Sequence, residues 1–163
     1  MAAPKHDPNA YGWSILRIGI GYIFLWAFID KLFGLKLSTC KGSSFGCSQA
    51  WVHGGSPTSG FLGHGVTGPF ASFYHHLAGN MLVDWAFMLG LLFIGVGLFF
   101  GTWIRSAAVA GMVMLALMWS ALLWPANAPA VDEHFIYFIA LFGILTTSAR
   151  PLWTLKQNLF KLP

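Results

Sequence analysis

The chain has 163 residues, of which 56% are hydrophobic and only 9% are charged, and its formal net charge is +4. Because soluble proteins average about 25% charged residues, this composition excludes an ordinary water-exposed surface and favours one that faces lipid. The basic residues are scattered along the chain, which excludes the clustered patch of a nucleic-acid-binding protein. We therefore expect residues 1–163 to form one all-α domain that is integral to a membrane.

Charged residues delimit four apolar segments, each able to supply the about 20 residues that cross a bilayer core. The predicted helices are residues 11–33, 81–101, 104–124 and 132–149. The first is interrupted by Arg17, and its apolar region is too long for a cleaved signal peptide. The spacing of Gly97 with Gly101, and of Ala107 with Gly111, favours close helix packing. The predicted fold is thus a four-transmembrane-helix bundle.

Lysine and arginine residues orient these helices, because cytoplasmic segments of membrane proteins carry an excess of them. With the N-terminus inside, the cytoplasmic side holds Lys5, Arg105, Arg150, Lys156 and Lys161. The outer side then holds Lys31, Lys36 and Lys41. This distribution predicts that both termini lie in the cytoplasm (N-in/C-in) and that the long loop of residues 34–79 is extracytoplasmic. The expected location is a bacterial or archaeal plasma membrane.

Most of the side chains that could take part in a reaction lie at the outer ends of the predicted helices. Because successive crossings run in opposite directions, the ends of the first and third helices lie level with the starts of the second and fourth. These ends carry Asp30, Lys31, Asp84, Trp119, Asp132, Glu133 and His134. Carboxylates at helix starts often only complement the helix dipole. Ionisable groups near lipid are costly and often functional, so the residues expected to be catalytic here are Asp84, Asp132, Glu133 and His134.

The loop of residues 34–79 is too long for a simple connection. Between Lys31 and Asp84 there is no acidic residue. The basic and titratable residues of the loop are Lys36, Lys41, His53, His64, His75 and His76. This positive field favours the approach of an anion from outside. Residues 54–62 are typical of a turn followed by apolar contact, and Pro69 favours the start of a short interfacial helix, so we expect the loop to fold back as a lid.

Cys40 and Cys47 are the only cysteines, and both lie in this loop. In an oxidising outer compartment they are expected to form a disulfide. Two interpretations stay open: a structural bridge that closes a small loop, or a redox-active pair next to an electron acceptor. A zinc site is not expected, because the spacing lacks the close cysteine pairs of such sites.

Arg17 lies within an otherwise apolar helix, close enough to its start for the side chain to snorkel to the cytoplasmic interface. The alternatives are an anchor for a lipid or quinone headgroup and a pairing with a carboxylate of the bundle. Histidines are absent from the middle of the predicted helices, which excludes a haem held between them, and there is no glycine-rich nucleotide-binding motif. No haem, flavin or metal is therefore expected.

Five segments form a recognisable series along the chain: residues 24–34, 54–62, 68–70, 83–85 and 131–137, which read FLWAFIDKLFG, GGSPTSGFL, GPF, VDW and VDEHFIY. Together they resemble the DoxX/DoxD family of small four-helix membrane proteins. The DoxD branch is the large subunit of thiosulfate:quinone oxidoreductase, which oxidises thiosulfate to tetrathionate and reduces membrane quinone together with a partner called DoxA. Other members are tied to thiol and oxidative-stress handling. The Cys40/Cys47 pair is not part of the family motif.

The resemblance implies a membrane-bound oxidoreductase that passes electrons from thiosulfate to quinone. The residues expected to bind these molecules are Arg17, Trp26, Asp30, Lys31, His53, Ser56, Thr58, Trp119 and Tyr137. Thiosulfate is expected near Lys31 and the loop histidines, and the quinone ring between aromatic side chains. If the cysteines take part, thiosulfate attacks the disulfide and the dithiol formed then reduces quinone.

Two other function classes stay open. One is a non-catalytic membrane scaffold that docks a peripheral redox enzyme, which suits a sequence without a cofactor motif. The other is a thiol–disulfide exchange protein that serves exported proteins. The expected partners are membrane lipid, quinone and a DoxA-like small subunit or peripheral redox enzyme. A homo-oligomer is left open.

Overall fold

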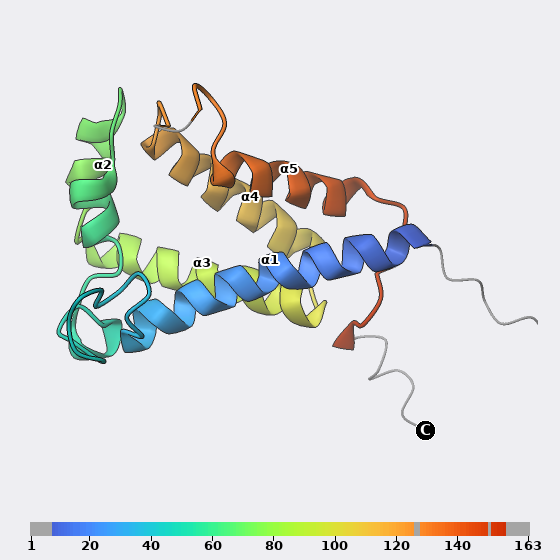
Figure 1. The fold of residues 1–163 in the computed structure, drawn as a ribbon, viewed down its shortest axis with the longest axis horizontal. Helices are drawn as coiled ribbons and strands as arrows, with labels where there is room; N and C mark the ends of the chain where they lie inside the picture. Colours follow the sequence, from blue (N-terminus) through green and yellow to red (C-terminus); the bar gives the residue numbers. More distant parts are fainter. Residues whose placement is uncertain (1–7, 126–127, 150, 156–163) are drawn as a thin grey trace, which may run out of the picture.

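Four long helices run along the longest axis of the molecule in the computed structural model, which describes residues 8–125, 128–149 and 151–155 (Figure 1). They are α1 (Pro8–Phe33), α3 (Met81–Phe100), α4 (Ile104–Ala121) and α5 (Glu133–Thr146). Three short helices lie between α1 and α3: η1 (Trp51–His53), η2 (Phe61–Gly65) and α2 (Ala71–Leu77). Within the described residues the protein is all-helical, as predicted.

Three of these helices, α1, α3 and α4, are long and apolar enough to cross a membrane. The sequence therefore encodes a helical membrane protein. The fourth predicted helix is shorter than expected, because α5 has 14 residues and ends at Thr146. The predicted third helix is also shortened, since α4 ends at Ala121. Four of the lysines and arginines used to orient the chain, at positions 5, 150, 156 and 161, lie outside the described residues.

Caps fix where the long helices begin and end. Asn80 accepts a hydrogen bond from the Leu82 amide at the start of α3, and Asp132 accepts one from the Phe135 amide at the start of α5. Asparagine and aspartate are favoured at this position because their side chains satisfy amides that the first turn leaves free. Gly101 ends α3 with a φ of 69°, a left-handed conformation that glycine adopts without strain.

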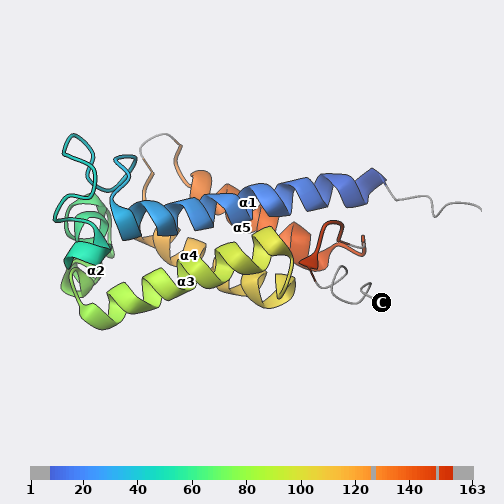
Figure 2. The ribbon, with the colours of Figure 1, turned by 90° about the horizontal axis from the view of Figure 1, so that it is seen from below.

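The helices pack as two antiparallel pairs, α1 with α3 and α4 with α5, and α3 also packs on α4. In Figure 2, α1 and α3 lie in front of α4 and α5. Glycines allow the backbones to approach closely. A Cβ atom on Gly95 of α3 would lie 2.8 Å from the Leu25 backbone nitrogen of α1, and one on Gly97 would lie 2.6 Å from the Cβ of Ala107 in α4. The close packing predicted from Gly97 and Ala107 is therefore confirmed. The core between the helices is apolar and includes the fully buried Met88, Ile94, Leu98 and Leu141.

The end of α1, the start of α3, the end of α4 and the start of α5 all lie at the same end of the bundle, as the predicted parity requires (Figure 1). We call it the loop end, because residues 34–79 fold there. Residues 61–77 form a strap that packs on the end of α4: Tyr74 donates to the Leu117 carbonyl over 3.1 Å, and the Thr67 amide donates to the Ala121 carbonyl over 3.2 Å. The short helix predicted at Pro69 is α2, which begins at Ala71.

Candidate functional site

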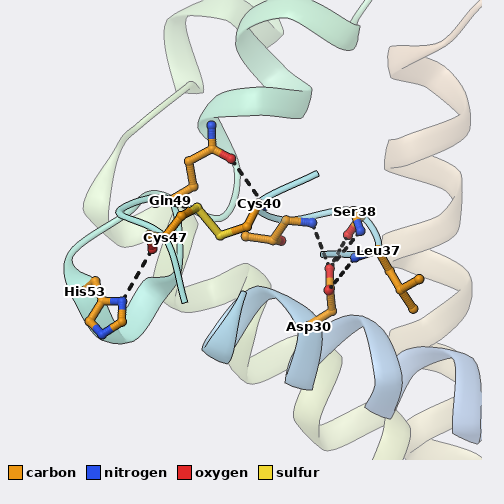
Figure 3. Close-up of a disulfide and its surroundings, with 8 residues drawn as sticks. Asp30, Leu37, Ser38, Cys40, Cys47, Gln49 and His53 are labelled. Carbon is orange, nitrogen blue, oxygen red and sulfur yellow. Dashed lines mark hydrogen bonds between the residues drawn. A yellow bond between two sulfur atoms is a disulfide. The ribbon is translucent and has the colours of Figure 1, made fainter. Parts of the chain in front are cut away.

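Asp30, at the end of α1, holds the first turn of the loop. Its side chain is only 1% exposed. One carboxylate oxygen accepts the Leu37 amide at 3.2 Å, and the other accepts the Ser38 amide at 3.0 Å, the Ser38 hydroxyl at 2.6 Å and the Thr39 amide at 2.9 Å (Figure 3). The neighbouring Lys31 donates to the same hydroxyl at 3.4 Å. Asp30, expected to bind substrate, is thus enclosed by its own loop.

Asp84, in the first turn of α3, holds a later part of the same loop. Its Oδ1 accepts the Ser56 hydroxyl at 2.9 Å, the Thr58 hydroxyl at 2.5 Å and the Thr58 amide at 3.2 Å. Asp84 is 6% exposed and Thr58 is 4% exposed. Hydrogen bonds to an ionised acceptor are roughly twice as strong as neutral ones. The structure therefore brings Asp84, Ser56 and Thr58 together, as a clasp between the loop and α3.

Asp132 and His134 form a pair at the start of α5. His134 Nδ1 lies 2.8 Å from Asp132 Oδ2, while Asp132 Oδ1 caps the helix through the Phe135 amide at 3.0 Å. The side chain of His134 is 13% exposed and that of Asp132 is 7% exposed, so solvent reaches each of them only at an edge. Glu133 is exposed beside them. A carboxylate on Nδ1 fixes the orientation of an imidazole and leaves Nε2 as the nitrogen that exchanges protons.

Two aromatic rings meet near the start of α5, where this pair lies. Trp119, at the end of α4, donates its indole N–H to the Ala130 carbonyl at 3.0 Å. Its ring lies 5.7 Å from the ring of Phe135, centroid to centroid. Tyr137 is half-buried further along α5. Asp132, His134, Trp119 and Phe135 are the candidate site that the rest of this article calls the α4–α5 site.

Ligand atoms of Asp132, Glu133 and His134 also lie within 4.8 Å of one another. Three such groups at that spacing satisfy the distance requirement of a metal site. Exposed acidic groups at a helix start commonly gather in this way without an ion, and a metal is not needed to explain the positions of these side chains, because the helix cap and the histidine already account for both oxygens of Asp132.

The predicted disulfide between Cys40 and Cys47 is present in the loop (Figure 3). Cys40 is fully buried, whereas Cys47 is half-buried and its sulfur accepts the Gln49 amide at 3.4 Å. The exposed His53 lies with Nδ1 3.4 Å from the Cys47 carbonyl oxygen. A nucleophile arriving from solvent would therefore meet the Cys47 sulfur, and Cys40 would be the leaving group.

The surroundings of Trp26 and Arg17 differ from those predicted. Trp26 stacks on Tyr22 of its own helix at 6.0 Å, and its indole nitrogen is buried without a hydrogen-bond partner among the described residues. No ring contact joins Trp26 to Trp119 or Tyr137 in the described part of the chain, so the three predicted quinone-binding aromatics do not form one cluster.

Arg17 does not snorkel to water, because its side chain is only 1% exposed. It donates to the carbonyls of Leu98 and Phe99 at the end of α3, and to those of Leu152 at 2.9 Å and Trp153 at 3.3 Å. It therefore caps α3 and docks the segment after α5. Sequence reasoning missed this role, because every residue carries a carbonyl and no residue type marks the partners.

The structure thus divides the carboxylates of the loop end into two groups. Asp30 and Asp84 hold the loop, whereas Asp132 pairs with a histidine at the α4–α5 site. Lys31 and His53 lie on the loop side. Comparison with known protein families, curated proteins and solved structures finds no match.

Proposed function

We propose that the chain is a membrane-bound oxidoreductase that oxidises a sulfur anion, thiosulfate, at its outer face and passes the electrons to membrane quinone. Two thiosulfate ions lose one electron each and join through a new S–S bond as tetrathionate. One quinone takes up those two electrons and two protons. The chemistry that the protein itself must supply is an anion site, an apolar wall for the quinone ring and a proton donor.

The observation that carries this proposal is the Asp132–His134 pair. Its two side chains are part-buried and lie 2.8 Å apart, at the start of the helix whose Phe135 ring meets that of Trp119. A histidine oriented by a carboxylate is an effective general acid at neutral pH. An aromatic wall suits a planar ring. Asp84, whose Oδ1 is engaged by Ser56 and Thr58, is less suited to that role.

The loop carries the positive charge that would attract the anion. Lys36, Lys41 and His53 are exposed on it, and no acidic residue lies between Lys31 and Asp84. The negative charge of Asp30 is enclosed by three amides and a hydroxyl, which leaves the outer surface of the loop positive. Such a field raises the local concentration of a small anion.

The proposal includes four membrane crossings with both termini in the cytoplasm and residues 34–79 outside a bacterial or archaeal plasma membrane. The fourth crossing is α5, whose 14 residues span about 21 Å at 1.5 Å per residue. The hydrocarbon core is about 30 Å thick. A helix shorter than the core is accommodated by local thinning of the bilayer and by its flanking residues.

The test uses the full-length protein purified in detergent, with thiosulfate and a soluble quinone analogue, in the presence and absence of a co-expressed DoxA-like small subunit. Quinol and tetrathionate are expected in equal amounts. Loss of general acid catalysis typically costs about 100-fold or more, so His134→Gln is expected to lower kcat by that factor. The matched control is His64→Gln, which alters an exposed loop histidine: it can raise KM for thiosulfate by weakening the positive field, but it is expected to leave kcat unchanged. Absence of turnover by correctly folded protein under both conditions would sink the proposal.

A second candidate function, thiol–disulfide exchange, is favoured by the half-buried Cys47, whose carbonyl oxygen lies 3.4 Å from Nδ1 of the exposed His53. The double variant Cys40→Ser/Cys47→Ser separates the two functions. Exchange with a reduced exported protein must then disappear, whereas quinone reduction at the α4–α5 site continues. Loss of both activities in a variant that keeps its helical content would instead assign the electron path to the disulfide.

A third candidate function, docking of a peripheral redox enzyme, is favoured by apolar side chains on the loop. Leu37, Phe45 and Phe73 are 60%, 68% and 61% exposed. A partner that co-purifies with the protein and keeps full activity without it would favour this function over the first.

A further inference from the structure

A cavity of about 790 Å³ opens at the end of the bundle opposite the loop. Its walls come from the first turns of α1, the connection between α3 and α4, and the segment that follows α5. The polar residues among them include Arg17, Thr102, Arg105 and Ser148, and the apolar ones include Trp13 and Ile144. This volume falls in the range of ligand pockets, about 300–1,000 Å³.

Two buried hydrogen-bonding groups at this cavity have no partner. They are Nε of Arg17 and Oγ1 of Thr102, and neither finds a hydrogen-bond acceptor or donor among the described residues. A buried donor left unsatisfied is destabilising, so native proteins usually satisfy such groups with a bound molecule or water. Both groups belong to residues that line the cavity.

Among the described residues, the charge of Arg17 also has no carboxylate partner. Its other two nitrogens donate to four backbone carbonyls, which are neutral. The histidine–carboxylate contact found among the described residues, His134–Asp132, lies at the loop end. The described lining of the cavity contains no Asp or Glu, whereas it adds a second cation, Arg105. A buried arginine without a counter-ion is costly, and an anionic ligand in the cavity would remove that cost.

The backbone adds to the positive field. α4 begins at this cavity, through Ile104, Arg105 and Ser106, and Trp103 at its N-cap makes no side-chain hydrogen bond to the first turn. The free amides of a helix start attract phosphate and other anions. The cavity therefore combines a helix start with a buried arginine that keeps one donor unpaired.

The surrounding side chains place the cavity at the depth of lipid headgroups. Trp103 and Trp153 are 60% and 54% exposed at this end of the bundle, and Tyr11 lies 5.9 Å from the Trp153 ring. Exposed tryptophan and tyrosine residues gather where the hydrocarbon core meets the headgroups. The apolar part of the wall suits the first carbons of acyl chains.

We propose that this cavity binds the phosphate of an anionic membrane lipid, with Arg17 Nε, Thr102 Oγ1 and Arg105 as its donors. A phosphate group would pair with the cations and accept hydrogen bonds from the hydroxyls of this cavity. The position of the cavity at the depth of the headgroups favours a lipid phosphate over free phosphate. The site lies at the opposite end of the molecule from the α4–α5 site, so it does not depend on the proposed redox function.

The test is a native mass spectrometry titration of the delipidated full-length protein in a non-ionic detergent. The probes are phosphatidylglycerol, the diacylglycerol with the same acyl chains, and inorganic phosphate. Phosphatidylglycerol is expected to bind at least about tenfold more tightly than either of the others, which corresponds to the contribution of about one charge-assisted hydrogen bond. Equal binding of diacylglycerol, or equal binding of inorganic phosphate, would overturn the lipid–phosphate assignment.

Variants locate the site. Arg105→Gln and Thr102→Val are each expected to weaken phosphatidylglycerol binding about tenfold. Both leave the Arg17 cap of α3 in place, which matters because Arg17→Gln also removes that cap. Lys41→Gln, which removes an exposed cation at the loop end, is the matched control and is expected to leave the affinity unchanged. An affinity that falls equally in Lys41→Gln, or in none of the variants, would contradict the proposed site.

Discussion

Asp30 receives hydrogen bonds from three consecutive residues of the loop, which makes its carboxylate the centre of a small folded turn. Substitution with alanine would leave the amides of Leu37, Ser38 and Thr39 without an acceptor. We expect Asp30→Ala to lower the free energy of unfolding by about 3 kcal/mol, measured by reversible unfolding in detergent. Lys36→Ala, at an exposed position of the same turn, is the control. A loss below about 0.5 kcal/mol, the scale of ordinary surface changes, would show that the turn holds without its carboxylate.

Asp84 and Thr58 are predicted to stabilise the protein jointly. Asp84→Ala and Thr58→Val each break the 2.5 Å contact between a hydroxyl and Oδ1. Residues in direct contact show coupling energies of about 0.5–3 kcal/mol in double-mutant cycles, and we expect a value in the upper half of that range because both side chains are buried. Thermal unfolding of the two single variants and the double variant measures it. Additive losses would mean that the clasp contributes no energy of its own.

Single residues show what the sequence can and cannot predict. The positions of Asp84 and Asp132 at helix starts follow from the boundary between polar loop and apolar helix, and the structure places both there. Their roles do not follow from it. The partners of Asp84 lie in an irregular loop without periodicity, and the partners of Arg17 are carbonyls 81 and 135 residues away. A hydrogen bond to a distant backbone leaves no trace in residue type.

Helix contacts depend on which glycines face a neighbour. A Cβ atom on Gly21 of α1 would collide with the backbone of Phe99 in α3, whereas one on Gly19 would meet nothing within 4 Å. We expect Gly21→Ala to destabilise the protein by about 1–3 kcal/mol, as overpacking does. Gly19→Ala is expected to be neutral or stabilising by up to about 1 kcal/mol, because alanine favours the helix. The melting temperatures in detergent compare the two, and equal shifts would contradict the close contact of α1 and α3.

Apolar composition predicts the existence and order of the helices better than their ends. The unbroken apolar run after Ala121 suggests that α4 continues to residue 124, yet the helix stops at the point where the strap packs on it. The end of α5 at Thr146 likewise follows from a change to extended backbone at Thr147, where neither charge nor proline marks a boundary. Tertiary contacts decide these ends, and a local pattern does not contain them.

At the scale of the whole molecule, the proposed orientation predicts which surfaces face outward. In intact cells, a cysteine introduced as Ser43→Cys in the exposed loop is expected to react with a membrane-impermeant maleimide. One introduced as Ser106→Cys, at the opposite end, is expected to react only after permeabilisation. The native cysteines do not interfere, because both are in the disulfide. The reverse labelling pattern would invert the assignment and place the positive loop in the cytoplasm.

The strap of residues 61–77 has a consequence for the order in which the protein is made. Its docking site, Leu117 to Ala121, is synthesised after it. The residues of α1 and α3 are synthesised before those of α4. Leu62, Val66 and Tyr74 therefore lack their apolar partner Ala121 until α4 has been made. The strap can therefore close only after the end of α4 has been synthesised.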